Sequence, residues 1–359
     1  MCRSDRTGRI TLALFFVLFL SLFVSVFFSG CTAKKEYNTT SVTTQIFNEI
    51  EAVENLSSSN NIQNFPSQSN YGKYGTYHIK ECGTIDKPGT YILDGDIVDN
   101  EDDCTSYRVN GLVMSTCRNK CLSIESDNVE IFCMGHSIIS NISNGTDSAD
   151  IPIVGGRNGP LSHLHIAGCK IYGGTALLIY GLNDSVIELN DIYSRDGIIL
   201  SHASSNVTIQ FNNISYNFAE DRFNGNGLVI YNSHNNTIKD NEFLNDNIGI
   251  LNDTGSSFIS NKIHNSEFQL GPAWPRDPSA YLVNNTLVAM NRFYNVTFYL
   301  KWANTVFFSY NKLTNSSIYN SKGLAYCPDQ GLKDGGGNQC SEDMGSNFCG
   351  VKCNPLKED

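Results

Sequence analysis

The sequence predicts an all-β solenoid, a parallel β-helix, and three observations lead to that class. A six-residue phrase, apolar-x-x-Asn-x-apolar, recurs from Ile166 to Leu313. The residue directly after the Asn is polar or charged in every copy. Cysteines gather at the two ends of the repeated region, where a stack of rungs lacks a neighbour to cover its core.

The phrase occurs seven times, and its middle residues are 21, 22, 29, 20, 30 and 20 positions apart. The copies are Ile166-Cys169-Ile171, Ile187-Asn190-Ile192, Ile209-Asn212-Ile214, Ile238-Asn241-Phe243, Phe258-Asn261-Ile263, Val288-Asn291-Phe293 and Phe308-Asn311-Leu313. A period of 20 to 22 residues with two insertions is typical of stacked rungs. The Leu spacing and helical segment of leucine-rich repeats are absent.

The polarity within the phrase predicts which side chains face the core. The residue that follows the Asn must face water, since it is Lys170, Asp191, Asn213, Glu242, Lys262, Arg292 and Lys312 in turn. Rungs lie one strand spacing apart, ~4.8 Å, so the Asn amides should form a hydrogen-bonded ladder. We expect one buried column of Ile192, Ile214, Phe243, Ile263, Phe293 and Leu313. A second strand, often opened by Gly, should follow in each rung.

These repeats resemble those of right-handed parallel β-helix proteins of the carbohydrate-binding, sugar-hydrolase and NosD-like periplasmic type. The stretches CGTIDKPGTYILDGDI (Cys82 to Ile97) and CLSIESDNVEIFCMGHSII (Cys121 to Ile139) resemble the opening module of exported prokaryotic surface proteins of this kind. The resemblance covers roughly residues 78 to 320. The resemblance implies a right-handed single-stranded solenoid. It does not specify a function, because proteins with this fold include lyases, hydrolases, epimerases, adhesins and spacers.

Residues 1–31 are predicted to be an export segment, because Arg3, Arg6 and Arg9 precede an uncharged apolar run. Phe28-Ser29-Gly30-Cys31 resembles a lipobox, in which Cys31 would be lipidated. An uncleaved signal anchor is the alternative. Both place the rest of the chain outside the cytoplasm, anchored to the cell membrane or cell surface.

Four further segments are predicted after the leader. Residues 32–76 are a Ser/Thr/Asn-rich tether with a possible short helix, 77–141 an N-terminal cap module, 142–320 the rungs and 321–359 a Cys-rich C-terminal cap. Without the charged leader residues the chain holds 22 basic and 35 acidic residues, a net charge of −13. That balance argues against nucleic acid as a partner.

Ten cysteines remain after Cys2 and Cys31, and we expect disulfide-bonded caps in an oxidising compartment. The predicted pairs are Cys82–Cys121, Cys104–Cys117 and Cys133–Cys169, although six cysteines allow fifteen pairings. No pairing is predicted among the four cysteines of the tail, which are Cys327, Cys340, Cys349 and Cys353. Their spacing lacks the paired knuckles of a zinc site. Twelve Asn-x-Ser/Thr sequences fit a glycoprotein.

The constellations of β-helix enzymes are largely missing. The sequence has no Gly-His-Gly or Arg-x-Lys signature of polygalacturonase-like hydrolases and no carboxylate cluster of the pectate-lyase type. No metal or cofactor is predicted, and calcium is left open. His163-Leu164-His165 should place both imidazoles on the outer face, with Asp184 beside His163 and Val186 beside His165. We interpret them as solvated surface residues.

Two features are candidates for ligand binding. Tyr172 and Tyr193 fall on adjacent rungs three positions after the ladder, where stacked rings could hold sugars or simply cover the strands. Two insertions, 217–226 and 271–283, should flank opposite edges of one sheet. The ligand-binding candidates within them are Arg222, Trp274 and Arg276, and the candidate catalytic acids are Glu220, Asp221 and Asp277.

The sequence thus predicts a membrane-anchored extracytoplasmic β-helix protein that binds or displays at the cell envelope. Glycans or other envelope components are the expected partners. The alternative is a polysaccharide lyase or glycoside hydrolase with its site between the two insertions. The two differ in whether two or three carboxylates converge in one groove.

Overall fold

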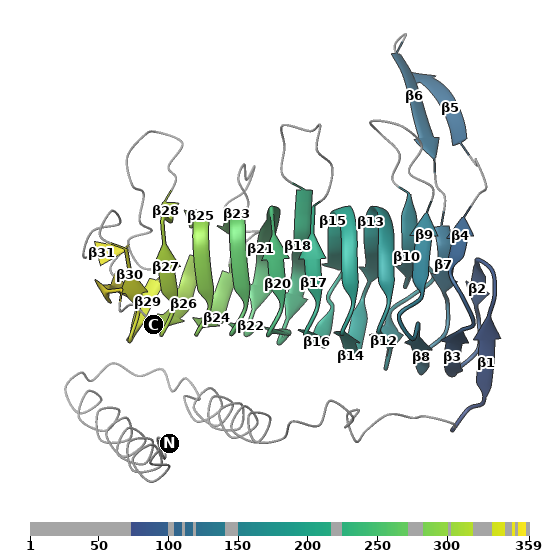
Figure 1. Cartoon of the computed structure of the whole chain (residues 1–359), viewed down its shortest axis with the longest axis horizontal. Coiled ribbons are helices and arrows are strands. Elements are labelled where there is room, and N and C mark those ends of the chain that lie inside the picture. The colour runs from purple at the N-terminus through teal and green to yellow at the C-terminus, as the bar shows by residue number, and fades with distance from the viewer. Residues whose placement is uncertain are drawn as a thin grey trace, which may run out of the picture. The chain divides into compact units, whose positions relative to one another are not determined.

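A computed structural model of the chain describes residues 73–99, 104–109, 112–117, 120–140, 150–216, 225–271, 283–300, 303–318, 332–341, 347–348 and 351–356. Within these ranges the chain forms a 29-stranded sheet in which every pairing is parallel. Each rung pairs with the next, so the sheet winds into a solenoid (Figure 1). The predicted all-β parallel β-helix is confirmed.

Each rung contributes to three faces of the solenoid. The first face holds β1 (Thr76–Ile79), β3 (Gly89–Leu93), β8 (Val129–Phe132), β11 (Leu161–Ser162), β12 (His165–Ala167), β14 (Leu182–Glu188), β16 (Ser205–Gln210), β19 (Thr237–Lys239), β22 (Ser257–Ile259), β24 (Val283–Ala289), β26 (Ala303–Ser309) and β29 (Leu332–Gly336). The chain turns at the Asn ladder as it leaves this face.

The second face follows the ladder. It holds β4 (Ile97–Asp99), β9 (Ser137–Ser140), β17 (Asn213–Ser215), β20 (Glu242–Leu244), β27 (Lys312–Thr314), β30 (Gln339–Cys340), β33 (Asn354–Pro355) and the first halves of β13 (Lys170–Tyr180), β15 (Asp191–Ser201), β23 (Lys262–Leu270) and β25 (Arg292–Leu300). The third face holds the second halves of these four strands with β2 (Gly83–Ile85), β7 (Lys120–Ile124), β10 (Ile151–Gly155), β18 (Gly225–His234), β21 (Asp246–Thr254) and β28 (Ser317–Ile318).

Two short antiparallel pairs lie outside this sheet. They are β5 (Cys104–Val109) with β6 (Leu112–Cys117), and β31 (Asn347–Phe348) with β32 (Val351–Lys352). The strands of the expected cap module, from β1 to β4 and β7 to β9, pair in register with the rungs that follow. They are therefore the first rungs of the same solenoid.

The core is one continuous apolar column inside the stack. Ile192, Ile214, Phe243, Ile263, Phe293 and Leu313 pair rung by rung and are at most 1% exposed, as predicted. Toward the C-terminus Phe replaces Ile, and the rings of Phe268, Phe293 and Phe298 pack edge to face. Such packing adds aromatic contact energy to the burial of apolar area.

The Asn ladder is confirmed. The Asn190 amide donates to the side-chain oxygen of Asn212 (3.0 Å), and the same bond repeats through Asn241, Asn261, Asn291 and Asn311. Each Asn oxygen also accepts the backbone N–H of the Asn one rung earlier, for example that of Asn212 on Asn241 (3.0 Å). Every rung turn therefore satisfies its buried polar groups through its neighbours.

The ladder has one more member than predicted. Asn338 follows three glycines, is fully buried and accepts from the Asn311 amide (3.2 Å). Cys340 follows it in the core position. Gly335 stands where the phrase has an apolar residue, and this substitution hid the copy from pattern analysis.

The residue before each ladder Asn has a left-handed backbone. Leu189, Phe211, Asp240, Ser260, Met290 and Tyr310 have φ between 54° and 57°. This conformation turns the chain and points the side chain outward, so Leu189, Phe211, Met290 and Tyr310 are all exposed. We call these six residues the pre-Asn row.

Disulfide bonds join Cys82 to Cys121 and Cys133 to Cys169, as predicted. In the tail, Cys340 bonds to Cys353. Cys104 and Cys117 stand opposite each other in the register of β5 and β6, but their side chains lie outside the described part of the structure. The Cys104–Cys117 bond therefore stays a prediction, and Cys327 and Cys349, for which no partner was predicted, also lie outside the described residues.

Several predicted features lie outside the described residues. They are the leader with Cys31, nearly all of the tether, and the candidates Glu220, Asp221, Arg222, Trp274, Arg276 and Asp277. None of the described segments is a helix of the length and hydropathy needed to span a bilayer.

Candidate functional site

Two hollows of the described surface lie on either side of one loop, Gly156–Pro160. The loop connects β10 on the third face to β11 on the first. Its sequence, Gly-Arg-Asn-Gly-Pro, provides two glycines with positive φ and a proline that ends the turn. Arg157, Asn158, Gly159 and Pro160 are exposed, so their polar groups can reach a ligand.

The larger hollow has a volume of about 820 Å³. Beside the loop it is lined by Ile151, Leu178, Tyr180, Gly181 and His202. The Tyr180 and His202 rings meet edge to face with their centroids 5.1 Å apart. The Ser201 hydroxyl lies 2.8 Å from the His202 Nδ1 atom and fixes that ring. The lining therefore combines two rings, one guanidinium and one amide.

Gly156 sets the shape of this hollow. Its φ is 74°, and a Cβ atom at this position would lie 1.9 Å from the carbonyl oxygen of Tyr180. Only glycine allows the loop to approach the end of β13 so closely. The close approach places Arg157 and Asn158 directly beside Tyr180 and His202 in the same lining.

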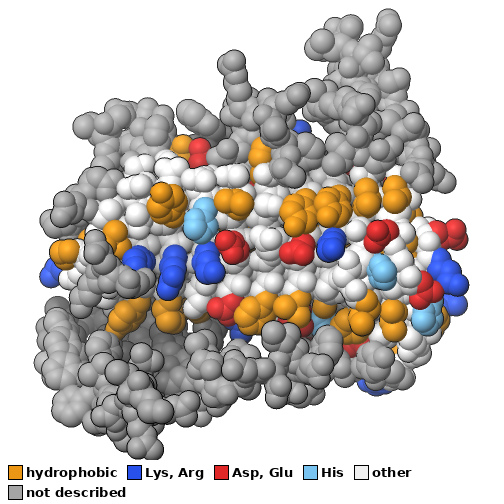
Figure 2. Space-filling model, in the orientation of Figure 1, with side chains coloured by type: hydrophobic (Ala, Val, Ile, Leu, Met, Phe, Trp, Pro, Cys, Tyr) orange, Lys and Arg blue, Asp and Glu red, His pale blue; other side chains and the backbone are white. Residues whose placement is uncertain are grey.

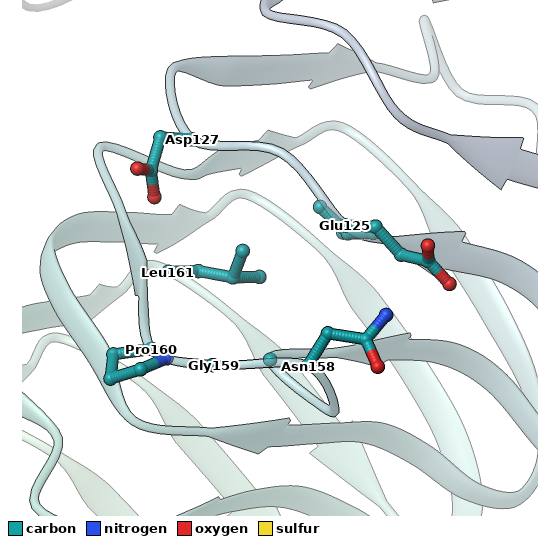
Figure 3. A pocket seen from close by; sticks show the side chains of 8 residues that line it. Glu125, Asp127, Asn158, Gly159, Pro160 and Leu161 are labelled. Carbon is teal, nitrogen blue, oxygen red and sulfur yellow. The ribbon is translucent and has the colours of Figure 1, made fainter.

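The smaller pocket, of about 130 Å³, lies on the other side of the loop (Figure 3). It is lined by Glu125 and Asp127 as well as by Asn158, Pro160 and Leu161. One Asp127 oxygen accepts the backbone N–H of Ser162 (2.7 Å), which fixes that carboxylate. The loop thus separates an acidic pocket from a hollow whose charged side chain is Arg157.

His163 and His165 differ from the prediction. Val186 stands beside His165 in the register, as expected, and His163 is exposed. His165, however, is buried at 8% exposure, not solvated. Its ring packs edge-on against Phe132, and its Nε2 atom lies 2.9 Å from a Glu188 oxygen.

Hydrogen bonds stabilise the Glu188 carboxylate in the His165–Glu188 pair against the effect of its burial. Burial of Glu188 acts to raise its pKa, but hydrogen bonds from His165 and Gln210 outweigh this and lower the pKa overall. Glu188 is therefore held as a carboxylate. Neither hollow beside the Gly156–Pro160 loop is lined by this pair, so we interpret it as a structural contact.

The stacking of Tyr172 on Tyr193 is confirmed, with ring centroids 5.1 Å apart and planes 13° from parallel. The two rings cover one face of each other, which leaves mainly edges and hydroxyl groups for a ligand. Ser215, Leu244, His264, Tyr294 and Thr314 continue the same register position along the second face. We call the column from Tyr172 to Thr314 the aromatic row.

Asp246 is the most unusual carboxyl group of the described residues. It is 1% exposed, it lies against Gly227, and neither of its oxygens has a hydrogen-bond partner. Burial, and secondly the charge of Asp196, raise the pKa of Asp246 to about 8. It stands in register with Gly225, where the chain returns from the first insertion. At neutral pH this group is mostly protonated.

Asp246→Asn should stabilise the fold at alkaline pH. The folded-state pKa of about 8 exceeds the ordinary value of 3.8, so the folded chain binds this proton more tightly and its unfolding free energy falls as pH rises between those values. The Asn variant avoids this loss, which has an upper limit of roughly 6 kcal/mol. The variant should melt only slightly above the parent at pH 5, where little of the loss has accumulated, and several degrees above it at pH 9.

The matched control for this experiment is Asp191→Asn, which changes a half-exposed carboxyl group on the second face. It should melt like the parent at both pH values. An Asp246→Asn shift of equal size at pH 5 and pH 9 would show that the effect is packing and not ionisation.

Sequence reasoning missed the Gly156–Pro160 loop, Tyr180, His202, Glu125 and Asp127. Two signals could have found them: the Gly-Arg-Asn-Gly-Pro turn itself and the Asp127-Asn128 pair directly before the apolar strand β8. No three His, Cys, Asp or Glu side chains of the described ranges lie together as a metal site. The sequence predicted no cofactor and left calcium open, and that prediction stays untested.

Rung register, ladder and core define the class of protein, a right-handed parallel β-helix. Residues 97–268 match a family model described as right handed beta helix region. The predicted resemblance to right-handed parallel β-helix repeats is therefore confirmed. A sequence search of curated proteins finds no match to the chain.

Solved structures that are similar to this chain include two enzymes and a tailspike protein. Pectin methylesterase PemA from Erwinia chrysanthemi is 12% identical, with 77% of this chain and 91% of that chain covered and a TM-score of 0.38. A mannuronic acid specific polysaccharide family 6 lyase from human gut microbiota is 15% identical (79% and 85% covered, TM-score 0.35). The Dettilon tailspike protein is 11% identical (78% and 60% covered, TM-score 0.37). This level of similarity transfers no activity to the present chain.

Proposed function

We propose that the protein is an exported, membrane-anchored β-helix that binds a glycan in the hollow beside the Gly156–Pro160 loop. The observation that carries this proposal is the composition of the hollow, in which Tyr180 and His202 stand beside Arg157 and Asn158. Its volume of about 820 Å³ is within the range of small-ligand sites.

The chemistry of the lining suits a sugar ring with an anionic or hydroxyl-rich edge. The aromatic side chains provide apolar area for the C–H faces of a pyranose. The Arg157 guanidinium provides a planar fork of donors for a carboxylate, a sulfate or neighbouring hydroxyl groups. The Asn158 amide can both donate and accept. Glu125 and Asp127 line only the smaller pocket on the other side of the loop, so none of the residues that line the hollow carries a carboxyl group.

A polysaccharide lyase or glycoside hydrolase is the second candidate, with its site between insertions 217–226 and 271–283. Asp246 favours it, because a carboxyl group protonated at neutral pH is the usual general acid of glycoside cleavage. Asp246 stands where the first insertion rejoins the sheet. The proposed acids Glu220, Asp221 and Asp277 and the ligand residues Trp274, Arg222 and Arg276 belong to the insertions themselves.

Variants of the hollow test the binding proposal. The full chain in mild detergent is first screened on a glycan array, and the affinity of each hit is then measured by calorimetry. Arg157→Ala and Tyr180→Ala should each weaken binding at least tenfold, since each removes an anchor worth about 1.4 kcal/mol or more. Each glycan that binds is also incubated with the protein and analysed by chromatography. Cleavage products would support the lyase or hydrolase candidate.

Tyr294→Ala is the matched control, because it removes an exposed tyrosine from the second face. It should bind the glycan as the parent does. If Tyr180→Ala binds normally while Tyr172→Ala or Tyr193→Ala is weakened, the ligand lies on the aromatic row and the hollow is not the site.

A further inference from the structure

The second face and the adjacent ladder turn carry three rows of outward side chains (Figure 2). The pre-Asn row and the aromatic row are largely apolar, and between them runs a charged row. Its members across six rungs are Asp191, Asn213, Glu242, Lys262, Arg292 and Lys312. Ten large hydrophobic residues of the described surface are exposed, and seven of them belong to the two apolar rows or their continuation at Val98. Apolar exposure concentrated on one face indicates a contact surface.

We propose that this three-row face binds a second copy of the chain, with the two solenoids antiparallel. The reason is that the face is complementary to itself. A twofold axis that lies across the rows, between the rungs of Glu242 and Lys262, brings each row against the same row of the other copy in reverse order. Closed homodimers use such isologous contacts, in which residue i meets j and j meets i.

The charged row pairs opposite signs under this operation. Glu242 meets Lys262 of the other copy, Asp191 meets Lys312, and the neutral Asn213 meets Arg292. Glu242 and Lys262 already lie 4.0 Å apart within one chain, so the axis completes a ring of two carboxylates and two ammonium groups. If the two solenoids were parallel, each charged residue would instead meet a residue of like charge. The acidic residues occupy one half of the row and the basic residues the other, and complementary charge of this kind fixes orientation and register in protein contacts.

The apolar rows fit the same register. Large side chains of the pre-Asn row meet each other, Leu189 against Tyr310 and Phe211 against Met290. In the aromatic row, Ser215 is the small member, and it leaves a notch between Tyr193 and Leu244. The twofold axis places Tyr294, 46% exposed, against Ser215 of the other copy.

The six rungs span about 24 Å at ~4.8 Å per step, which makes a small interface. Contacts of this size give reversible, weak association. The charge pattern and the notch distinguish a second copy from a glycan, which does not offer a basic half opposite the acidic residues and an acidic half opposite the basic ones. The surface is also separate from the hollow beside the Gly156–Pro160 loop, so the two sites can be tested independently.

Charge exchange tests the proposal. Glu242→Lys and Lys262→Glu each place like charges opposite one another at the axis, whereas an equimolar mixture of the two variants restores opposite charges in a mixed dimer. Sedimentation velocity of the full chain in mild detergent is recorded over a range of concentrations. Protein without N-linked glycans is used, because Asn213 stands in an Asn-x-Ser sequence on this face.

We expect the parent to dimerise reversibly, each variant to associate at least tenfold more weakly, and the mixture to recover to within about threefold of the parent. Equal melting temperatures of parent and variants confirm that the fold is intact. A parent that stays monomeric at every concentration, a variant that associates like the parent, or a mixture that does not recover would each overturn the proposal. Loss of glycan binding in Tyr294→Ala with a monomeric parent would assign the face to a glycan.

Discussion

Ile214→Asp should abolish folding of the solenoid. Ile214 is fully buried and stands between Ile192 and Phe243 in the inner column. A carboxylate at this position would have no partner among these apolar neighbours, and the penalty for an unpaired buried charge is comparable to the whole stability of a domain. Circular dichroism should show loss of the β spectrum and of the melting transition.

The matched control is Asn213→Asp, which places the same charge on the adjacent, exposed residue. It should fold and melt like the parent. An Ile214→Asp chain that melts like the parent would show that the inward register of the rungs is wrong.

Asn241→Ala should destabilise the solenoid by roughly 3–5 kcal/mol. The Asn241 amide donates to the carbonyl oxygens of Ile209 and Lys239 and to the Asn261 side chain, and its oxygen accepts from Asn212. Alanine would leave several of these buried groups without partners, and each costs about 1–3 kcal/mol. A melting temperature lower by about 10 °C is expected.

Asn213→Ala provides the comparison for this change, since it removes an exposed Asn from the rung that precedes Asn241. It should alter the melting temperature by no more than about 2 °C. Equal shifts for the two variants would contradict the structural role of the ladder.

The sequence predicts the fold well because the phrase occurs seven times, and each copy places apolar and polar residues at the same positions of a rung. Ile192, Ile214 and Phe243 occupy one inward position, and any slip of one residue would expose all of them. Two of the three predicted cap disulfides follow from the same register, which brings Cys82 to Cys121 and Cys133 to Cys169. The rung of Asn338 was not predicted, because Gly335 replaces the apolar residue with which the phrase begins.

The hollow could not be predicted in this way. It depends on how one irregular loop, Gly156–Pro160, meets Tyr180 and His202, which are 20 to 46 positions away in the sequence. No periodic pattern reports a loop of that kind. The burial of His165 was missed for a related reason, since its partner Glu188 lies two positions beyond the residue that pairs with it.

Hydrogen–deuterium exchange of the full chain, with and without the tightest glycan of the array, tests the central claim most directly. Binding in the hollow should protect backbone amides of residues 156–161, 178–182 and 201–203 and leave those of the second face unchanged. Protection confined to the second face, or to the two insertions, would contradict the proposed site.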